Sequence, residues 1–270
     1  MSGAGSVDAG QLGWLVTVFV GVLGLLVGSF LNVVAWRVPR GESIVSPPSA
    51  CPSCGHQVRA RDNVPVVSWL LLRGRCRDCG APISGRYPLV EAITGVLFVL
   101  VLWKFGLSID FVAFAYLAAL GVVLTSIDLS VHRLPNVLVL PAYGVLGVLF
   151  VAASAVAGDW WPLARAAIGG VVLFAFYFAA ALVYPGGMGF GDVKLAGVIG
   201  MALGWLGWGE LVVGSFAAFL LGGVAGVVLM LARRADRRSG IPFGPWMVGG
   251  AAVGVAWGAP LWDAYTGTWA

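Results

Sequence analysis

Eight apolar stretches of membrane-spanning or nearly membrane-spanning length dominate this 270-residue chain. A transmembrane helix needs about 20 apolar residues. Hydrophobic residues make up 60% of the chain and charged residues only 10%, which is more apolar surface than a soluble core of this size requires. The stretches are 12–36, 89–105, 110–127, 137–157, 163–184, 193–208, 211–232 and 245–262. We therefore expect an all-α polytopic membrane protein, a bundle of about eight transmembrane helices.

The distribution of basic residues orients this bundle. No Lys or Arg precedes the first stretch, whereas Arg37 and Arg40 follow it directly, so it is predicted to be a retained anchor with its N-terminus outside. Threading eight helices from there makes four connecting segments cytoplasmic: 37–88, 128–136, 185–192 and 233–244. These segments and their margins hold fourteen of the sixteen Lys and Arg residues, as the positive-inside rule requires.

The formal net charge of +4 raises the question of an anionic partner. The basic residues are distributed by loop, and the chain has no recognisable nucleic-acid-binding motif. We therefore expect the lipid bilayer, and no nucleic acid, among its partners.

One segment between the apolar stretches has a different composition. In residues 37–88, Arg, Pro, Ser and Cys replace the Gly, Ala, Val and Leu background, so we expect a small folded cytoplasmic insert. It holds Cys51 and Cys54 in one Cys-x-x-Cys-Gly knuckle and Cys76 and Cys79 in a second, with 21 residues between the pairs. Such a doubled knuckle can offer four thiolates to one tetrahedral Zn²⁺.

Two disulfides or free thiols are the competing interpretation of these cysteines, but the reducing cytosol disfavours lasting disulfides. Four cysteines would close the coordination shell, so His56 is not expected to be a ligand and the metal would have no open position for catalysis. We therefore predict a structural Zn²⁺ that stabilises an insert too small to depend on apolar burial, and no catalytic metal.

Two aspartates stand at membrane depth, where ionisable side chains are costly and usually functional. Asp128 ends the third apolar stretch, and Asp192 follows a glycine-rich segment at the start of the sixth. A structural interpretation is open for each, with Asp192 as an N-cap and Asp128 as a helix-end residue facing headgroups. As a pair they can share one proton, so that one carboxylate activates water while the other polarises a peptide carbonyl and protonates the leaving amine.

The helix ends suggest which aspartate takes which role. A helix dipole disfavours negative charge at a C-terminal end, as at Asp128, and favours it at an N-terminal end, as at Asp192. We hypothesise that Asp192 is the ionised base and Asp128 the protonated acid. Gly189 and Gly191 would let an extended substrate strand approach Asp192 closely.

Four further polar residues carry weaker expectations. Glu91, near the cytoplasmic start of the second stretch, has either a structural hydrogen bond to a neighbouring helix or an accessory role in binding substrate or amine. Lys194 is predicted to be a headgroup anchor that points away from Asp192, with an accessory role in shaping the site as the alternative. Asn32 is expected to make an interhelical hydrogen bond, and the loop residue His132 to be solvated.

A set of motifs in this chain resembles the bacterial type IV prepilin peptidases, which are GxGD aspartic proteases. Besides the cysteine knuckles, the motifs are Gly28-Ser29-Phe30-Leu31-Asn32-Val33, Arg37-Val38-Pro39, Arg86-Tyr87-Pro88-Leu89-Val90-Glu91, Ile127-Asp128, Leu134-Pro135-Asn136, Gly189-Phe190-Gly191-Asp192-Val193-Lys194 and Ile241-Pro242-Phe243-Gly244-Pro245. They occur in order over nearly the whole chain.

The resemblance implies an activity, a location and a division of the chain. Asp128 and Asp192 would cleave the short basic leader of type IV prepilins or pseudopilins after a glycine, at the cytoplasmic face of the bacterial inner membrane. Forms with the cysteine insert are associated with N-methylation of the new N-terminus by S-adenosylmethionine, although no nucleotide fingerprint locates a methyl-donor site here. The domains would be an anchor (1–36), a zinc-binding insert (37–88) and a peptidase domain (89–270).

Two alternatives remain open at this stage. In a non-enzymatic membrane transporter or assembly scaffold the aspartates would bind protons or a cation, but the paired repeats typical of transporters are not visible in the sequence. Presenilin-like and signal-peptide peptidases share the GxGD chemistry but place their first aspartate in a Tyr-Asp motif, whereas Ile127 precedes Asp128 here.

Overall fold

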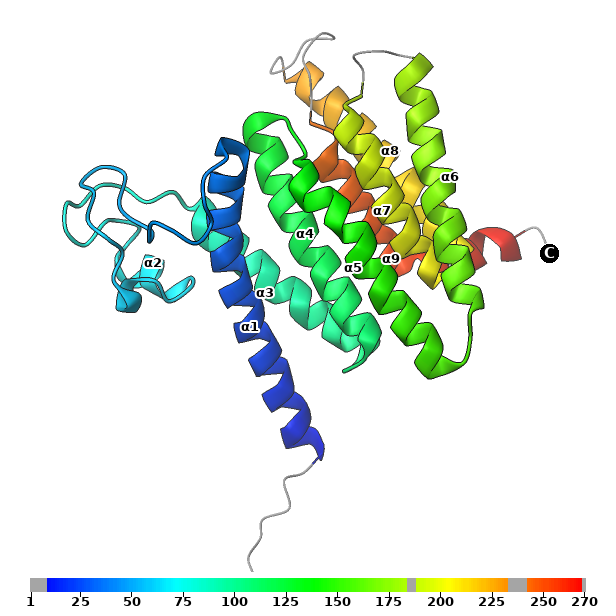
Figure 1. Cartoon of the computed structure of the whole chain (residues 1–270), viewed down its shortest axis with the longest axis horizontal. Helices are drawn as coiled ribbons and strands as arrows, with labels where there is room; N and C mark the ends of the chain where they lie inside the picture. The colour runs from blue at the N-terminus through cyan, green and yellow to red at the C-terminus, as the bar shows by residue number, and fades with distance from the viewer. Residues whose placement is uncertain (1–8, 184–187, 233–241, 269–270) are drawn as a thin grey trace, which may run out of the picture. The chain divides into compact units, whose positions relative to one another are not determined.

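Long helices account for most of the chain (Figure 1). The computed structural model describes residues 9–183, 188–232 and 242–268, and these contain helices and no strand. The long helices are α1 (Ala9–Arg37), α3 (Arg86–Phe105), α4 (Ile109–Val131), α5 (Asn136–Ala157), α6 (Trp161–Val183), α7 (Phe190–Leu206), α8 (Trp208–Leu231) and α9 (Gly244–Gly267). They correspond one to one with the eight predicted stretches, which confirms the predicted fold class.

Six of these helices are long and apolar enough to cross a membrane, and α7 and α9 are not among them. The α7 helix has only 17 residues, which agrees with the shortness of the predicted sixth stretch. The structure also extends the third helix beyond the predicted residue 127 to Val131. The predicted cytoplasmic segments 185–192 and 233–244 lie partly outside the described residues.

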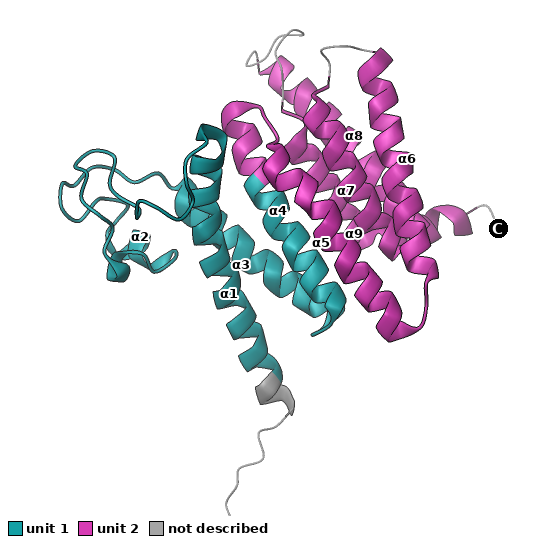
Figure 2. Cartoon of the chain, in the orientation of Figure 1, with its two compact units in different colours: residues 1–123 teal, residues 124–270 magenta. Residues whose placement is uncertain are grey.

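The chain packs as two compact units, residues 1–123 and 124–270 (Figure 2). In the first unit α1 packs along α3, over a core that includes Val20, Phe98 and Leu102. In the second unit the main pairs are α6 with α7 and α8 with α9. The predicted division into anchor, insert and peptidase domain is a functional one, and it stays a prediction.

Glycines let the paired helices approach closely. A Cβ atom added at Gly204 of α7 would lie 2.7 Å from the carbonyl oxygen of Arg165 on α6, and Gly200 and Gly169 also meet backbone to backbone. Backbones can come this near only where side chains are absent, as expected of helices that cannot be driven together by the hydrophobic effect. The helices α8 and α9 meet in the same way, since a Cβ atom added at Gly250 of α9 would lie 2.6 Å from the carbonyl oxygen of Gly214 on α8.

The insert folds around two similar turns. An isolated β-bridge joins Ala50 to Gln57, and another joins Arg75 to Pro82, so each bridge brackets one cysteine knuckle. Between them lie the short 3-10 helix η2 (Ala60–Asp62) and the five-residue helix α2 (Val67–Leu71).

Candidate active site and cysteine cluster

Asp128 lies in the last turn of α4, in the part of that helix that belongs to the second unit. Only 5% of the residue is exposed, and its Oδ2 accepts a hydrogen bond of 3.1 Å from the N–H of Gly244, at the start of α9. The helix ends soon afterwards, where His132, with a positive φ of 51°, donates its N–H to the Asp128 carbonyl oxygen. The Asp128 carboxylate therefore leaves from the side of a helix and not from a loop.

Asp192 occupies the third position of α7 and is also buried, with 9% exposed. Its Oδ2 accepts the N–H of Gly189, the N-cap residue, at 3.1 Å, and its own N–H donates to the Gly189 carbonyl oxygen at 3.0 Å. A carboxylate that reaches back from the third position to the N-cap satisfies one of the N–H groups that a helix start leaves open. Asp192 is therefore not itself the N-cap, and Gly189 shapes its setting.

Leu134 lies between the segments that hold the two aspartates. A Cβ atom added at Gly191 would lie 2.9 Å from the Leu134 Cβ, and one added at Gly244 would lie 3.4 Å from the Leu134 Cδ2. Gly191 precedes Asp192, and Gly244 donates to Asp128. Three segments far apart in the chain thus converge on one leucine, and both buried carboxylates belong to this convergence.

Lys194 lies beside the same segments. Its Nζ donates to Asn136 Oδ1 at 2.9 Å and lies 4.7 Å from the centre of the Phe190 ring, while Tyr143 of α5 donates its hydroxyl to the Lys194 carbonyl oxygen at 2.6 Å. These bonds join the start of α7 to α5. We predicted that Lys194 binds lipid headgroups, whereas in the structure its Nζ is bonded to Asn136. The accessory role of Lys194 in the site stays a prediction.

Glu91 has a structural contact in the first unit, with the insert and not with the neighbouring helix that we expected. Its Oε2 accepts the N–H of Val66 at 2.7 Å, and the residue is 8% exposed. Val66 has φ 60° and ψ −50°, and Val67 donates to the Pro65 carbonyl oxygen at 2.6 Å, which together define a γ-turn of the strained, positive-φ kind. A β-branched residue rarely adopts this conformation. Glu91 therefore holds a strained turn of the insert, and its proposed role in substrate binding stays a prediction.

The expected interhelical bond of Asn32 is confirmed. Its Nδ2 on α1 donates to the Tyr87 carbonyl oxygen on α3 at 3.1 Å.

The four cysteines converge into one cluster. The Sγ atoms of Cys51, Cys54, Cys76 and Cys79 all lie within 4.8 Å of one another, and those of Cys51 and Cys79 are 3.8 Å apart. Thiolates bound tetrahedrally to zinc at about 2.3 Å would be about 3.8 Å apart. Backbone N–H groups of Cys54 and Ser53 lower the pKa of the Cys51 thiol, whereas burial and neighbouring thiols raise the pKa of the Cys54 and Cys79 thiols, so only Cys51 is favoured as a thiolate without a metal. The donor set and its spacing fit a structural metal ion.

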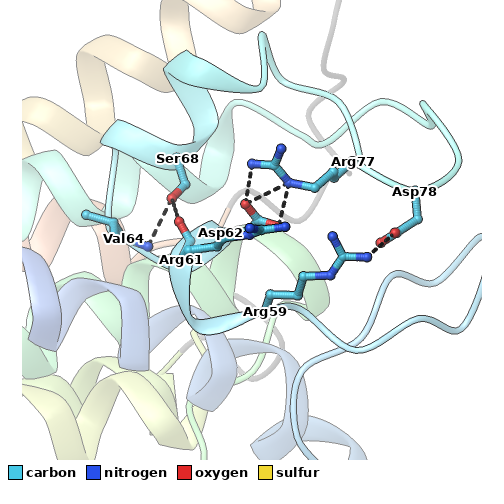
Figure 3. Close-up of polar contacts among 7 residues, drawn as sticks. All are labelled: Arg59, Arg61, Asp62, Val64, Ser68, Arg77 and Asp78. Carbon is cyan, nitrogen blue, oxygen red and sulfur yellow. Dashed lines mark hydrogen bonds and ion pairs between the residues drawn. The ribbon is translucent and has the colours of Figure 1, made fainter.

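Two ion pairs brace the cluster from outside (Figure 3). Arg77 follows Cys76 and makes a bidentate bond to Asp62, with Nη2 to Oδ1 at 2.6 Å and Nε to Oδ2 at 2.9 Å. These bonds lower the pKa of the Asp62 carboxyl. Arg59 pairs with Asp78 at 2.7 Å. Both pairs join the two residues between Cys76 and Cys79 to the η2 region.

Arg165 was not among the expected site residues. It lies on α6, where its Nε donates to the Gly204 carbonyl oxygen at 2.6 Å and its Nη2 donates to those of Trp205 and Leu206 at 2.6 and 2.9 Å. These are carbonyls that the end of α7 would otherwise leave open. Arg165 is one of the two basic residues, with Lys104, that fall on the side of the membrane poor in basic residues, and this is the signal in the sequence that could have identified it.

Taken together, the fold and these sites define a class: a multi-pass helical membrane protein with two buried aspartates and a four-cysteine insert. Residues 22–105 match the bacterial peptidase A24 N-terminal domain, and residues 112–231 match the type IV leader peptidase family. The chain belongs to this family, and the predicted resemblance is confirmed.

Curated relatives agree over most of the chain. It is 36% identical to the prepilin leader peptidase/N-methyltransferase of Stutzerimonas stutzeri, over 90% of this chain and 91% of that protein. It is 37% identical to the protein of that name from Aeromonas hydrophila, over 92% of each chain. Identity to the Neisseria gonorrhoeae protein is 39%, over 78% of this chain and 82% of that one. No solved structure matches the chain.

Proposed function

We propose that this protein is a membrane-embedded aspartic endopeptidase that removes the short basic leader from type IV prepilins or pseudopilins, after a glycine, at the cytoplasmic face of the bacterial inner membrane. The observation that carries the proposal is the pair of buried carboxylates, Asp128 and Asp192, each bonded to the backbone N–H of a glycine in segments that meet at Leu134. Membership of the type IV leader peptidase family supports it.

The proposed chemistry needs one proton shared between the two carboxylates. Ionised Asp192 removes a proton from a water molecule, which attacks the scissile carbonyl, while protonated Asp128 donates a hydrogen bond to the carbonyl oxygen and then gives its proton to the leaving amine. The position of Asp192 at a helix start, where N–H groups favour negative charge, supports this assignment. Infrared titration that finds the retained proton on Asp192 would reverse the roles.

Two cofactors belong to the proposal. The four cysteines would hold a structural Zn²⁺, which would cross-link the two knuckles and take no part in peptide cleavage. N-methylation of the new N-terminus would use S-adenosylmethionine, as the names of the relatives suggest.

The test is to incubate purified protein with a prepilin and to measure the product by mass spectrometry. We expect a shortened product that begins directly after a glycine, and a further mass of one methyl group when S-adenosylmethionine is added. Asp128→Asn and Asp192→Asn should each abolish cleavage without unfolding the protein, whereas Asp263→Asn, at an exposed position on α9, should not. An intact substrate with the wild-type protein, together with aspartate-dependent ion movement across vesicles, would favour the transporter instead.

A further inference from the structure

An exposed apolar face marks the short helix α2 of the insert. Val67, Leu70 and Leu71 are spaced i, i+3 and i+4 and therefore lie on one side of the helix, where they are 49%, 61% and 77% exposed. The other side packs inward, because Ser68 is buried and Trp69 donates its indole N–H to the Ile83 carbonyl oxygen at 3.0 Å. Large apolar side chains grouped in this way on an outer face usually meet another surface.

Basic side chains flank this face. Arg73 and Arg75 follow α2 and are exposed, and Arg61 is held beside it by the hydrogen bond of 3.1 Å from Ser68 Oγ to the Arg61 carbonyl oxygen (Figure 3). Within the described part of the insert, the ion pairs use Arg59 and Arg77 and leave these three arginines without a carboxylate partner. The surface therefore combines an apolar face with basic side chains that make no ion pair.

The depth of α2 follows from its attachment to α3. Val66, the residue before α2, is bonded to Glu91, which lies five residues inside a helix that can span the membrane. At 1.5 Å per residue, that is about 8 Å along α3 from its first residue. On the α1 side, a Cβ atom added at Gly28 would lie 2.7 Å from the Glu91 Cα, well before α1 ends at Arg37. Accordingly, in Figure 1 the height of α2 falls between the two ends of α1 and not beyond the C-terminal end of α1.

We propose that α2 is a membrane-interface anchor: Val67, Leu70 and Leu71 enter the leaflet surface at the Arg37 end of α1, and Arg61, Arg73 and Arg75 bind anionic phospholipid headgroups. An apolar face edged by arginines, at the depth where headgroups meet hydrocarbon, has the chemistry of helices that lie in a membrane surface. The charge favours lipid over the proposed substrate, because arginines repel a basic leader peptide. The anchor does not depend on the peptidase activity.

Hydrogen exchange of the full-length protein in nanodiscs, one protein per disc, tests this anchor. The reporters are amides bonded within and after α2, those of Leu70, Leu72 and Gly74. In discs with anionic phosphatidylglycerol we expect exchange about tenfold slower in the wild type than in the Leu70→Gln/Leu71→Gln variant, because lipid burial of two leucines stabilises the closed helix. Val45→Gln, which changes an insert residue that is 86% exposed, should exchange like the wild type at these amides.

Three further measurements separate charge from apolar contact. Arg73→Gln/Arg75→Gln, zwitterionic lipid and about 1 M salt should each remove part of the protection, since high salt shortens the Debye length to about 3 Å. Equal exchange in every lipid and in both double variants would overturn the anchor. So would protection that appears only after prepilin is added, or only with two proteins per disc, because the occupant would then be a peptide or a second copy.

Discussion

Replacing Gly244 by alanine should damage the peptidase while leaving the protein folded. The new Cβ would lie 2.7 Å from Asp128 Oδ2, whereas non-bonded atoms of this size settle at about 3.5 Å or more. The carboxylate must therefore retreat by about 0.8 Å. Its bond from the Gly244 N–H is already 3.1 Å long, so a retreat of this size lengthens it past the hydrogen-bonding range.

The expected loss follows from this displacement. Misplacing a catalytic group by about 1 Å can cost about 100-fold in rate. This corresponds to about 2.7 kcal/mol of transition-state stabilisation, at about 1.4 kcal/mol for each factor of ten. The cost to folding is smaller, because overpacking of about 1–3 kcal/mol is partly offset by the gain of about 1 kcal/mol when alanine replaces glycine in a helix.

The measurement is kcat for prepilin cleavage, together with the unfolding temperature in detergent. The matched control is Gly249→Ala on the same helix, where the added Cβ meets only the flexible end of Leu221, at 3.3 Å. We expect kcat to fall about 100-fold in Gly244→Ala and to change little in Gly249→Ala. Wild-type kcat in a folded Gly244→Ala protein, or equal losses in both variants, would refute the reasoning.

Three further predictions concern the supports of the two sites. Arg165→Met removes three hydrogen bonds worth about 0.6 kcal/mol each in a membrane, so the unfolding temperature should fall by roughly 4–8 °C. Arg165→Lys should recover part of this loss. An unchanged unfolding temperature in Arg165→Met would show that Arg165 does not stabilise the C-terminal end of α7. In a double-mutant cycle, Lys194→Met and Asn136→Ala should each lower the rate of cleavage, and the double variant should lose less than the sum of the two single losses. Additive losses would show that the bond of 2.9 Å does not couple α5 to α7. Elemental analysis should find one Zn²⁺ per protein, and a strong chelator or Cys51→Ser should remove it and increase proteolysis of residues 37–88. A protein that never contains zinc would refute the metal assignment.

The helices and the cysteine cluster were predictable because their signals are local. Apolar length alone gave all eight long helices, and the Cys-x-x-Cys-Gly spacing gave a cluster whose turns are closed by hydrogen bonds within each knuckle, such as Gly55 to Cys51 and Gly80 to Cys76. The extension of α4 past Asp128 was missed because polar residues can end an apolar stretch without ending its helix. Apolarity limits the membrane span, whereas backbone hydrogen bonds limit the helix.

The partners of the site residues were not predictable, because they depend on the rotation and depth of packed helices. Gly244 donates to a carboxylate 116 positions earlier, and no periodicity encodes that contact. The bond from Lys194 to Asn136 likewise depends on α5 lying against α7. Pairwise glycine contacts have the same origin, since a small-residue spacing indicates that a helix packs closely but not which helix it packs against.

The short length of α7 and its bonds to Arg165 together determine how deep Asp192 lies in the membrane. A helix of 17 residues is about 26 Å long, less than the hydrocarbon thickness of about 30 Å. Most of its residues are buried, so it cannot tilt freely, and Arg165 holds its C-terminal carbonyls. Because a guanidinium is best placed near the headgroups, we expect the C-terminal end of α7 to lie at one membrane border. Asp192, two residues in from the other end, would then lie about 7 Å below the opposite border. That is deep enough to be shielded from bulk water and shallow enough for water and an extended peptide to reach it.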